Sequence, residues 1–403
     1  MSVSTSLRSK LLSLMKSDRL FLTVPCCAVP TRSSLPSRQL TALSRRNLSV
    51  PSRYVATLPV ERLKLDDPLA ESVTTSPEVS PYQIVEKDLL ACYREIKADL
   101  ACDLPELVEL AQYYFTAHGK AFRPMVVLLM AEICAKDSGG VVSTVAAKQR
   151  RVAVITEMIH TASLIHDDVI DEADTRRNQP SLHKVWGEKK AILAGDYILS
   201  VASRELAKLR NPDVIICLAQ VIEDLVKGEL MQIGSKDGTA SSRLTAYLSK
   251  TYYKTASLLA NSCKAVAMLS NCSEEAVERC YQFGKTLGMA FQLVDDKLDF
   301  VATADDMGKP TAVDLTLGLA TAPVLFAAEK DLSLDALIQR RFSKAGDVSI
   351  ARQAVIEHKG VDQTHNLAGK YCQEATKCLS SFQSSREKDA LLKVIDMVLT
   401  RSK

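Results

Sequence analysis

The sequence predicts an all-α protein built as a single large helical bundle, and three observations carry that prediction. Its 403 residues include only 15 Gly, 14 Pro and 5% aromatic residues with one Trp, which disfavours a β-sandwich or β-barrel. No segment of any length shows the apolar-polar alternation of a strand. Helical apolar patterns instead follow one another from about Pro81, in a composition that is 47% hydrophobic and 25% charged and therefore typical of a globular core.

The expected helices are separated by residues that end helices. Gly or Pro stands in the breaks, as at 139–140 and at Pro212. Ser273 and Ser385 are placed to cap the first amides of the helices that follow them. The expected helices span 84–101, 105–117, 122–137, 143–172, 188–209, 212–233, 242–270, 273–302, 314–330, 333–343, 349–357, 361–382 and 385–400.

Residues 1–60 differ in composition from the rest of the chain. They hold nine Lys and Arg but one acidic residue, Asp18, amid many Ser, which is typical of an organellar transit peptide. We expect a mitochondrial address processed within 45–60, with a disordered basic tail as the alternative. Residues 61–83 are expected to be a linker, and 84–403 one helical domain.

Charge and hydropathy exclude two classes of protein. The formal charge of +3 becomes −5 when the nine basic residues and one acidic residue of 1–60 are set aside, so no nucleic-acid partner is expected. No run of eighteen apolar residues free of charge occurs, so any membrane contact would be peripheral. Eleven Cys without a CxxC pair predict reduced, structural thiols rather than a zinc site or redox pair.

Two acidic clusters end apolar helical stretches. In the first, Asp167 and Asp171 are four residues apart and share a helix face with Asp168 beside them. The second repeats the pattern with Asp295, Asp296 and Asp299. Carboxylates at a helix C-terminus repel one another and oppose the helix dipole. Divalent cations with oxygen ligands remove that cost, and Mg²⁺ is usual where phosphates share the coordination shell.

Basic residues recur around both clusters. Arg forks bind phosphate oxygens in pairs and Lys adds a point charge. Together with the acidic clusters these cations predict a cavity for two diphosphates, one chelated through metal and one held by cations alone. The cationic positions are Lys120 and Arg123, Arg176 and Arg177, Lys254 with Thr255, and Lys309.

These motifs, in this order, resemble the all-trans polyprenyl diphosphate synthases from about residue 112 to 330 and more loosely to the C-terminus. The segment 307–323 is similar to the catalytic subunit of animal decaprenyl and solanesyl diphosphate synthases, which make the ubiquinone side chain in mitochondria. The resemblance implies an isoprenoid-synthase helical bundle with a central elongation cavity. It also implies a prenyltransferase that condenses isopentenyl diphosphate with farnesyl or geranylgeranyl diphosphate.

The family's roles carry over residue by residue. The resemblance makes Asp167, Asp171 and Asp295 the ligands of two to three Mg²⁺ ions. Asp168, Asp296 and Asp299 then support or share those ions, and Lys254 belongs with the catalytic set. Lys120, Arg123, His160 and Arg177 match the isopentenyl diphosphate site, while Arg176, Lys254, Thr255, Gln292 and Lys309 match the allylic diphosphate site.

Product length is set in this family by the residues four and five positions before the first aspartate. Here these positions are Ser163 and Ala162, whose small side chains would leave the elongation tunnel open. A long product, beyond the C15 and C20 classes, is therefore expected, and the resemblance to decaprenyl and solanesyl diphosphate synthases implies the C45–C50 class. The alternative is that Ala162 and Ser163 only let two helices approach closely.

Other functions remain open at this point. A class I terpene synthase shares the helical bundle and one acidic motif, although it would lack the Lys-x-x-Arg site. A non-catalytic or obligately heteromeric subunit is a second alternative, although all six aspartates are present. The sequence does not decide between a homodimer and a heterotetramer with a degenerate second subunit. It also leaves open which allylic diphosphate is the preferred starter substrate, and whether the protein lies in the matrix or is associated with the inner membrane.

Overall fold

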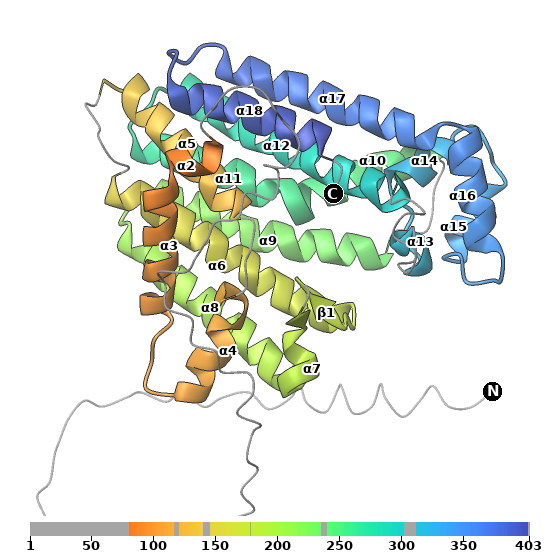
Figure 1. Cartoon of the computed structure of the whole chain (residues 1–403), viewed down its shortest axis with the longest axis horizontal. Coiled ribbons are helices and arrows are strands. Elements are labelled where there is room, and N and C mark those ends of the chain that lie inside the picture. Colours follow the sequence, from red (N-terminus) through yellow and green to blue (C-terminus); the bar gives the residue numbers. More distant parts are fainter. Residues whose placement is uncertain are drawn as a thin grey trace, which may run out of the picture. The chain divides into compact units, whose positions relative to one another are not determined.

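The computed structural model describes residues 80–116, 121–139, 146–177, 179–234, 240–301 and 312–401, and the fold over these ranges is helical (Figure 1). Its elements are α2 (Pro81–Ile84), α3 (Glu86–Asp99), α4 (Pro105–Thr116), α5 (Phe122–Asp137), α6 (Ala147–Ile170), β1 (Thr175–Arg176), β2 (Gln179–Pro180), α7 (Leu182–Trp186), α8 (Glu188–Lys208), α9 (Pro212–Gly234), α10 (Ala240–Thr251), the π-helix η3 (Tyr252–Ala256), α11 (Ser257–Leu269), α12 (Glu274–Val301), α13 (Val313–Thr316), α14 (Ala322–Ala328), α15 (Leu334–Gln339), α16 (Asp347–Glu357), α17 (Gly360–Leu379) and α18 (Arg386–Thr400).

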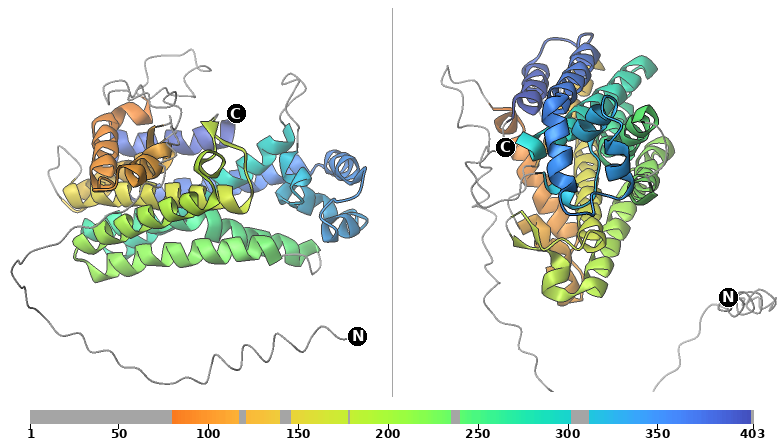
Figure 2. Two further views of the ribbon diagram at one scale, coloured as in Figure 1. Left: turned by 90° about the horizontal axis from the view of Figure 1, so that it is seen from below. Right: turned by 90° about the vertical axis from the view of Figure 1, so that its right-hand side faces the viewer.

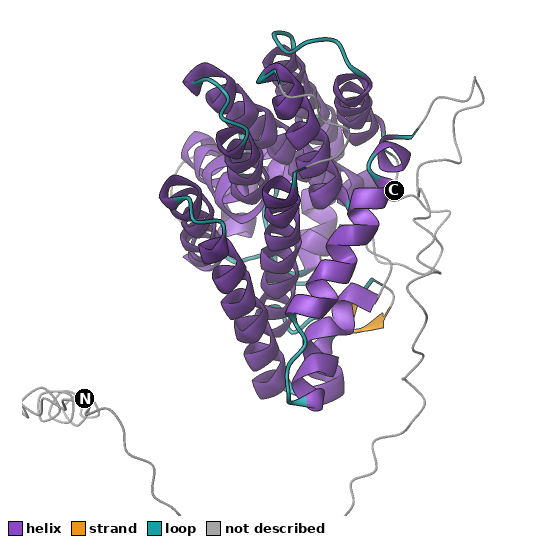
Figure 3. Ribbon diagram, turned by 90° about the vertical axis from the view of Figure 1, so that its left-hand side faces the viewer, coloured by secondary structure: helices purple, strands orange, loops and turns teal. Residues whose placement is uncertain are grey.

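The expected all-α class is confirmed, and the differences from the expected elements are local. A two-residue antiparallel pair, β1 with β2, follows the first acidic cluster, and Figure 3 shows it as the small orange element beside the helices. Strands this short carry no alternation, so no sequence pattern predicts them. The helix expected over 242–270 is divided by η3, and that expected over 314–330 is divided into α13 and α14. The short helix α7 was not expected at all.

Helices α11 and α12 lie at the centre of the bundle. Helix α12 packs against α11 and α17, and α11 also contacts α5, α6 and α9. Helix α6 lies between α5 and α8 (Figures 1 and 2). The two helices that carry the acidic clusters, α6 and α12, are therefore both packed against α11.

A glycine sets how closely α12 approaches η3. A Cβ on Gly288 would lie 2.7 Å from the Cα of Ala256, the last residue of η3. That distance is shorter than any real carbon contact, so the helices reach their spacing only without a side chain at this position. Because η3 carries two of the expected site residues, this contact positions the site.

The N-terminal expectations fall largely outside the described residues. The expected transit segment 1–60 does so entirely, and the expected linker 61–83 overlaps the described residues only at its end, where α2 begins at Pro81. Within the described ranges, none of the helices has both the length and the apolar character needed to span a bilayer.

We predict that Gly288→Ala lowers stability by about 1–3 kcal/mol, because the new methyl group forces α12 away from the η3 backbone. Gly369→Ala is the matched control: Gly369 lies inside α17, and a Cβ there meets nothing within 4 Å. The control is expected to gain about 0.5–1 kcal/mol from its better helix propensity. Thermal unfolding of both variants checks this, and equal melting temperatures would contradict the close approach.

Candidate active site

The first acidic cluster lies at the C-terminal end of α6. Asp167 and Asp168 are in its last turn, and Asp171 follows the helix, with its backbone N–H donating to the Asp167 carbonyl at 2.8 Å. The structure therefore brings Asp167 and Asp171 together at one helix end, as their spacing predicts.

Asp168 has a different environment from its two neighbours. Its residue is 1% exposed, and its carboxylate accepts from the Tyr114 hydroxyl at 2.7 Å and from Arg176 Nε at 2.9 Å. The backbone N–H of Leu182 donates to the same tyrosine oxygen at 3.0 Å. Asp168 thus fixes the β1–β2 turn against α4 and α6, and its contacts are those of a positioning residue.

Asp167 and Asp171 hold an excess of negative charge. Burial raises the pKa of Asp167 to about 6, and burial also raises the pKa of Asp171. Nearby Glu229 on α9 adds to both effects, while Lys254 opposes them from 3.5 Å away from the Asp167 carboxylate. Lys254 also pairs with Glu229 itself. One lysine faces three carboxylates, so their negative charge is only partly neutralised and a further cation would be stabilised here.

The π-helix η3 directs two consecutive side chains to the two clusters. Lys254 lies beside Asp167, and the Thr255 hydroxyl donates to Gln292 Oε1 on α12 at 2.9 Å. A single π-turn within a longer helical run often marks a functional site. Gly228 on α9 permits this one, since a Cβ there would lie 2.8 Å from the Lys254 backbone nitrogen.

In the second cluster, Asp296 is bound within the protein. It is 4% exposed and accepts from the Tyr247 hydroxyl and from Gln292 Nε2, the latter at 2.8 Å. A continuous chain of hydrogen bonds therefore joins Thr255, Gln292, Asp296 and Tyr247. Burial raises the pKa of Asp296.

Asp295 faces the C-terminus of the chain. Arg401 donates to the Asp295 carboxylate at 2.7 Å and to the Phe291 carbonyl at 2.6 Å, and its guanidinium stacks 4.1 Å from the Phe291 ring centroid. The Arg401 side chain is 8% exposed. No recognisable motif surrounds Arg401 in the sequence, so Arg401 was not predicted to be a site residue.

Asp299 caps a helix, and this brings a further carboxylate into the site. Its oxygens accept from the backbone N–H groups of Val313 at 3.0 Å and Asp314 at 3.2 Å, at the start of α13. Burial, followed by repulsion from Asp296 and Asp299, raises the pKa of Asp314 to about 7. Asp314 was not predicted to be a site residue because no other acidic residue accompanies it in a cluster. It does lie in the segment 307–323, which resembles the family.

A separate basic group is formed by Arg123 at the start of α5 and Arg177 directly after β1, with His160 on α6 beside them. Arg123 Nη1 and His160 Nε2 are 3.0 Å apart. The pKa of His160 is held well below its usual value by burial and by Arg123, Arg177 and Arg176, so the imidazole is neutral and accepts from Arg123. Arg177 donates to the Tyr114 carbonyl at 3.4 Å from a left-handed backbone with φ of 51°. These clustered guanidinium groups suit an anionic ligand.

Two other positions in the predicted set are on α6. Ala162 is fully buried, and Ser163 donates its hydroxyl to the His160 carbonyl at 2.8 Å. The remaining expected residues, Lys120 and Lys309, lie outside the described residues.

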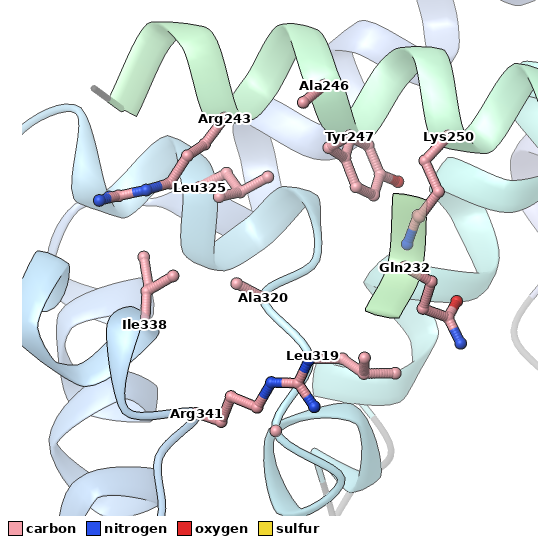
Figure 4. A pocket seen from close by; sticks show the side chains of 11 residues that line it. Gln232, Arg243, Ala246, Tyr247, Lys250, Leu319, Ala320, Leu325, Ile338 and Arg341 are labelled. Carbon is pink, nitrogen blue, oxygen red and sulfur yellow. The ribbon is translucent and has the colours of Figure 1, made fainter. Parts of the chain in front are cut away.

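A pocket adjoins the second cluster on the side of α10. Tyr247 and Lys250 line it from α10, Leu319 from the turn before α14, and Arg341 from the turn after α15 (Figure 4). Tyr247 links this pocket to Asp296 through its hydroxyl. Lys250 therefore adds a positive charge behind the acidic cluster.

The carboxylates fit Mg²⁺, although they do not surround an ion by themselves. Among the described residues, no three His, Cys, Asp or Glu side chains are arranged to hold one metal. The raised pKa values of Asp167, Asp171 and Asp314 nevertheless show carboxylates that a divalent cation would stabilise in the charged form. Mg²⁺ is commonly held by one or two carboxylates, with substrate phosphates completing its shell.

Comparison with known proteins places this bundle in a defined class. Solved structures with the same fold are prenyl synthases, so the fold is of the isoprenoid synthase type. Heptaprenyl diphosphate synthase from Staphylococcus aureus matches with a TM-score of 0.72 and 26% identity, covering 81% of this chain and 100% of that one. A medium/long-chain prenyl pyrophosphate synthase from Arabidopsis matches with a TM-score of 0.63 and 34% identity, over 81% and 100%.

The particular family follows from the sequence. The family model described as polyprenyl synthetase matches residues 104–355, and the chain belongs to this family, whose members generally use Mg²⁺. The chain is 52% identical to human all-trans-polyprenyl-diphosphate synthase PDSS1 over 324 residues, covering 80% of this chain and 77% of the relative. It is 39% identical to mitochondrial solanesyl-diphosphate synthase 1 of rice, over 80% and 79%.

We predict that Asp314→Asn lowers kcat at least tenfold, equivalent to about 1.4 kcal/mol in the barrier, and raises the Mg²⁺ concentration for half-maximal rate. The reason is that the amide removes one of the charges grouped around Asp296 and Asp299. Steady-state rates over a Mg²⁺ titration measure both effects. Asp362→Asn, at an exposed position in the first turn of α17, is the control. An Asp314→Asn enzyme with the control's kinetics would remove Asp314 from the site.

Proposed function

We propose that this chain is the catalytic subunit of a long-chain all-trans-polyprenyl diphosphate synthase. It would condense isopentenyl diphosphate with farnesyl or geranylgeranyl diphosphate to give a C45–C50 product, the side chain of ubiquinone. The observation that carries this function is the pair of carboxylate clusters on α6 and α12, joined through consecutive residues of η3, with a separate cation group around Arg123. Family membership and the named relatives favour it over a terpene synthase.

The allylic diphosphate would bind at the carboxylate clusters. Asp167, Asp171 and Asp295 are the proposed ligands of two to three Mg²⁺ ions, with Asp314 near Asp295. When bound, Mg²⁺ supplies Lewis acidity and neutralises the diphosphate as a leaving group. Lys254 is oriented by Glu229 and Asp167, and Thr255 by Gln292, so both side chains are held where a phosphate oxygen would meet them. Lys309 is proposed for the same diphosphate.

Arg176 has a modified role in this proposal. Its guanidinium is bound to the buried Asp168, so it orients the β1–β2 turn and offers its remaining N–H groups to the ligand. Asp296 and Asp299 likewise act through the groups they bind, namely Gln292 and the start of α13. We therefore infer that three of the six aspartates position other groups.

Isopentenyl diphosphate would bind to Arg123, Arg177 and Lys120. Neutral His160 accepts from Arg123 and fixes its guanidinium without adding a competing negative charge. The isopentenyl double bond then attacks the allylic carbon as its bond to diphosphate breaks, and the released proton passes to the departing pyrophosphate. Positioning of the two substrates supplies much of the rate enhancement.

The growing chain would extend along α6. Ala162 is buried one to two turns before Asp167, so the size of its side chain limits the space beneath the allylic site. A small residue there supports an open elongation cavity and a long product. The proposed setting is the mitochondrion, and the proposed assembly is a homodimer or a heterotetramer with a second subunit.

Incubation of the full chain with farnesyl diphosphate, isopentenyl diphosphate and Mg²⁺, followed by product sizing, tests the activity. We expect C45–C50 products, and no product when EDTA removes the metal. Product only after a second subunit is added would assign catalysis to a heteromer. No product under either condition would overturn the proposed function.

Ala162→Tyr is predicted to shorten the product by several isoprene units, because the phenol would block the cavity below the allylic site. Ala162→Ser is the matched control, since it changes the volume little and should leave the length distribution unchanged. Mass analysis of the dephosphorylated products measures the length. An unchanged distribution in an active Ala162→Tyr enzyme would show that Ala162 only allows close helix packing.

A further inference from the structure

Three cysteines gather where α5 ends and α12 begins. Cys134 lies near the end of α5, Cys272 in the turn between α11 and α12, and Cys280 in the second turn of α12. The sulfurs of Cys134 and Cys280 are 3.6 Å apart, and Cys280 is also 3.5 Å from the sulfur of Met130. Cys134 and Cys280 are fully buried, whereas Cys272 is partly exposed. The group therefore has one thiol that solvent reaches and two that it does not.

The backbone turn holds Cys272 against Cys134. Helix α11 ends with Asn271 in a left-handed conformation, φ 55°. The Asn271 N–H donates to the Met268 carbonyl at 3.1 Å, and the Cys272 N–H donates to the Ala267 carbonyl at 3.2 Å. This is a Schellman motif, and Asn is one of the residues that tolerates its left-handed position. The motif fixes the Cys272 sulfur 3.6 Å from the Cys134 carbonyl oxygen.

The thiols of Cys272 and Cys134 differ in acidity. A hydrogen bond from Cys134 lowers the pKa of Cys272, with help from the charge of Arg279 and against burial and Asp137. The same contact, together with Cys280 and burial, raises the pKa of Cys134. Cys272 is thus the more acidic of the two thiols and, being partly exposed, the one from which we expect the thiolate that oxidants attack.

This group is separate from the diphosphate site. Cys134 and Arg123 are eleven residues apart on α5, and Cys280 and Asp295 are fifteen apart on α12. At 1.5 Å per residue these separations correspond to about 16 and 22 Å along the helices. Nothing in the proposed reaction uses these thiols, so an inference about them stands independently of the proposed function.

We propose that Cys272 and Cys134 form a reversible oxidation site for hydrogen peroxide. The Cys272 thiolate attacks one peroxide oxygen, the O–O bond breaks, and Cys272 becomes a sulfenic acid while the second oxygen leaves as hydroxide and takes up a proton. The Cys134 thiol then attacks the sulfenic sulfur, forms the S–S bond and releases water. In balance, two thiols and one peroxide give one disulfide and two waters, and the two electrons lost by sulfur reduce the peroxide.

The disulfide would tie the end of α5 to the turn that precedes α12. Both elements pack on the central helix α11, so the crosslink would join segments 138 residues apart in the chain. Thiol reductants restore the pair by exchange. The site would keep its reactive thiol from irreversible oxidation because Cys134, whose carbonyl oxygen lies 3.6 Å from the Cys272 sulfur, would supply the resolving thiol.

The test uses the reduced full chain, treated with stoichiometric hydrogen peroxide, blocked with N-ethylmaleimide and digested for mass mapping. We expect one linked peptide pair containing Cys134 and Cys272, with two fewer free thiols per chain, both reversed by dithiothreitol. Cys272 found as sulfinic acid without a linked partner would overturn the proposal, and so would linkage of Cys134 to any other cysteine in place of Cys272.

Two variants sharpen the test. Cys102→Ser removes an exposed thiol whose sulfur lies 3.6 Å from the Leu104 carbonyl, and it should leave the linkage unchanged. Cys134→Ser should abolish the linkage and leave Cys272 as a sulfenic acid that dimedone labels at least tenfold more than in the unaltered chain. Equal dimedone labelling of Cys272 in both proteins would contradict Cys134 as the resolving thiol. The wild-type map decides the proposal even if a variant fails to fold.

Discussion

The site depends on holding two groups of carboxylates close together inside a helical bundle. Like charges repel more strongly where water is excluded, and burial, together with repulsion from neighbouring carboxylates, raises the pKa values of Asp167, Asp171 and Asp314. The fold limits this cost by giving several carboxylates permanent partners. Asp168 binds Arg176 and Tyr114, Asp296 binds Gln292 and Tyr247, and Asp299 caps α13. Asp167 and Asp171, two of the proposed metal ligands, keep an excess of negative charge, whereas the third, Asp295, pairs with Arg401.

The π-turn connects these two groups. Its two consecutive side chains contact opposite clusters, Lys254 at Asp167 and Thr255 at Gln292. The turn fits only because Gly228 and Gly288 allow α9 and α12 to approach its backbone. Helix packing therefore controls the separation of the clusters, and through it the space in which we propose that a diphosphate binds.

The sequence predicted most of the fold and the helices on which the two acidic clusters lie, for identifiable reasons. Long apolar helices and regularly spaced aspartates leave a strong local signal, so α6, α12 and their clusters were located closely. The roles within each cluster depend on partners distant in the chain, such as Tyr114 for Asp168 and Tyr247 for Asp296. Glu229, Asp314 and Arg401 were missed because each stands alone in the sequence and reaches the site only through the tertiary fold. The turn β1–β2 was missed because its strands have two residues each.

We propose that the protein holds one diphosphate through metal and the other by cations alone. Isothermal titration calorimetry of the full chain measures this directly, with isopentenyl diphosphate and with a non-reactive thiolodiphosphate analogue of farnesyl diphosphate, each with Mg²⁺ and with EDTA. We predict that EDTA abolishes binding of the allylic analogue and leaves the isopentenyl diphosphate affinity within about threefold, a difference of about 0.6 kcal/mol. If EDTA weakened binding of both ligands equally, or left binding of both unchanged, the result would contradict this difference between the two sites.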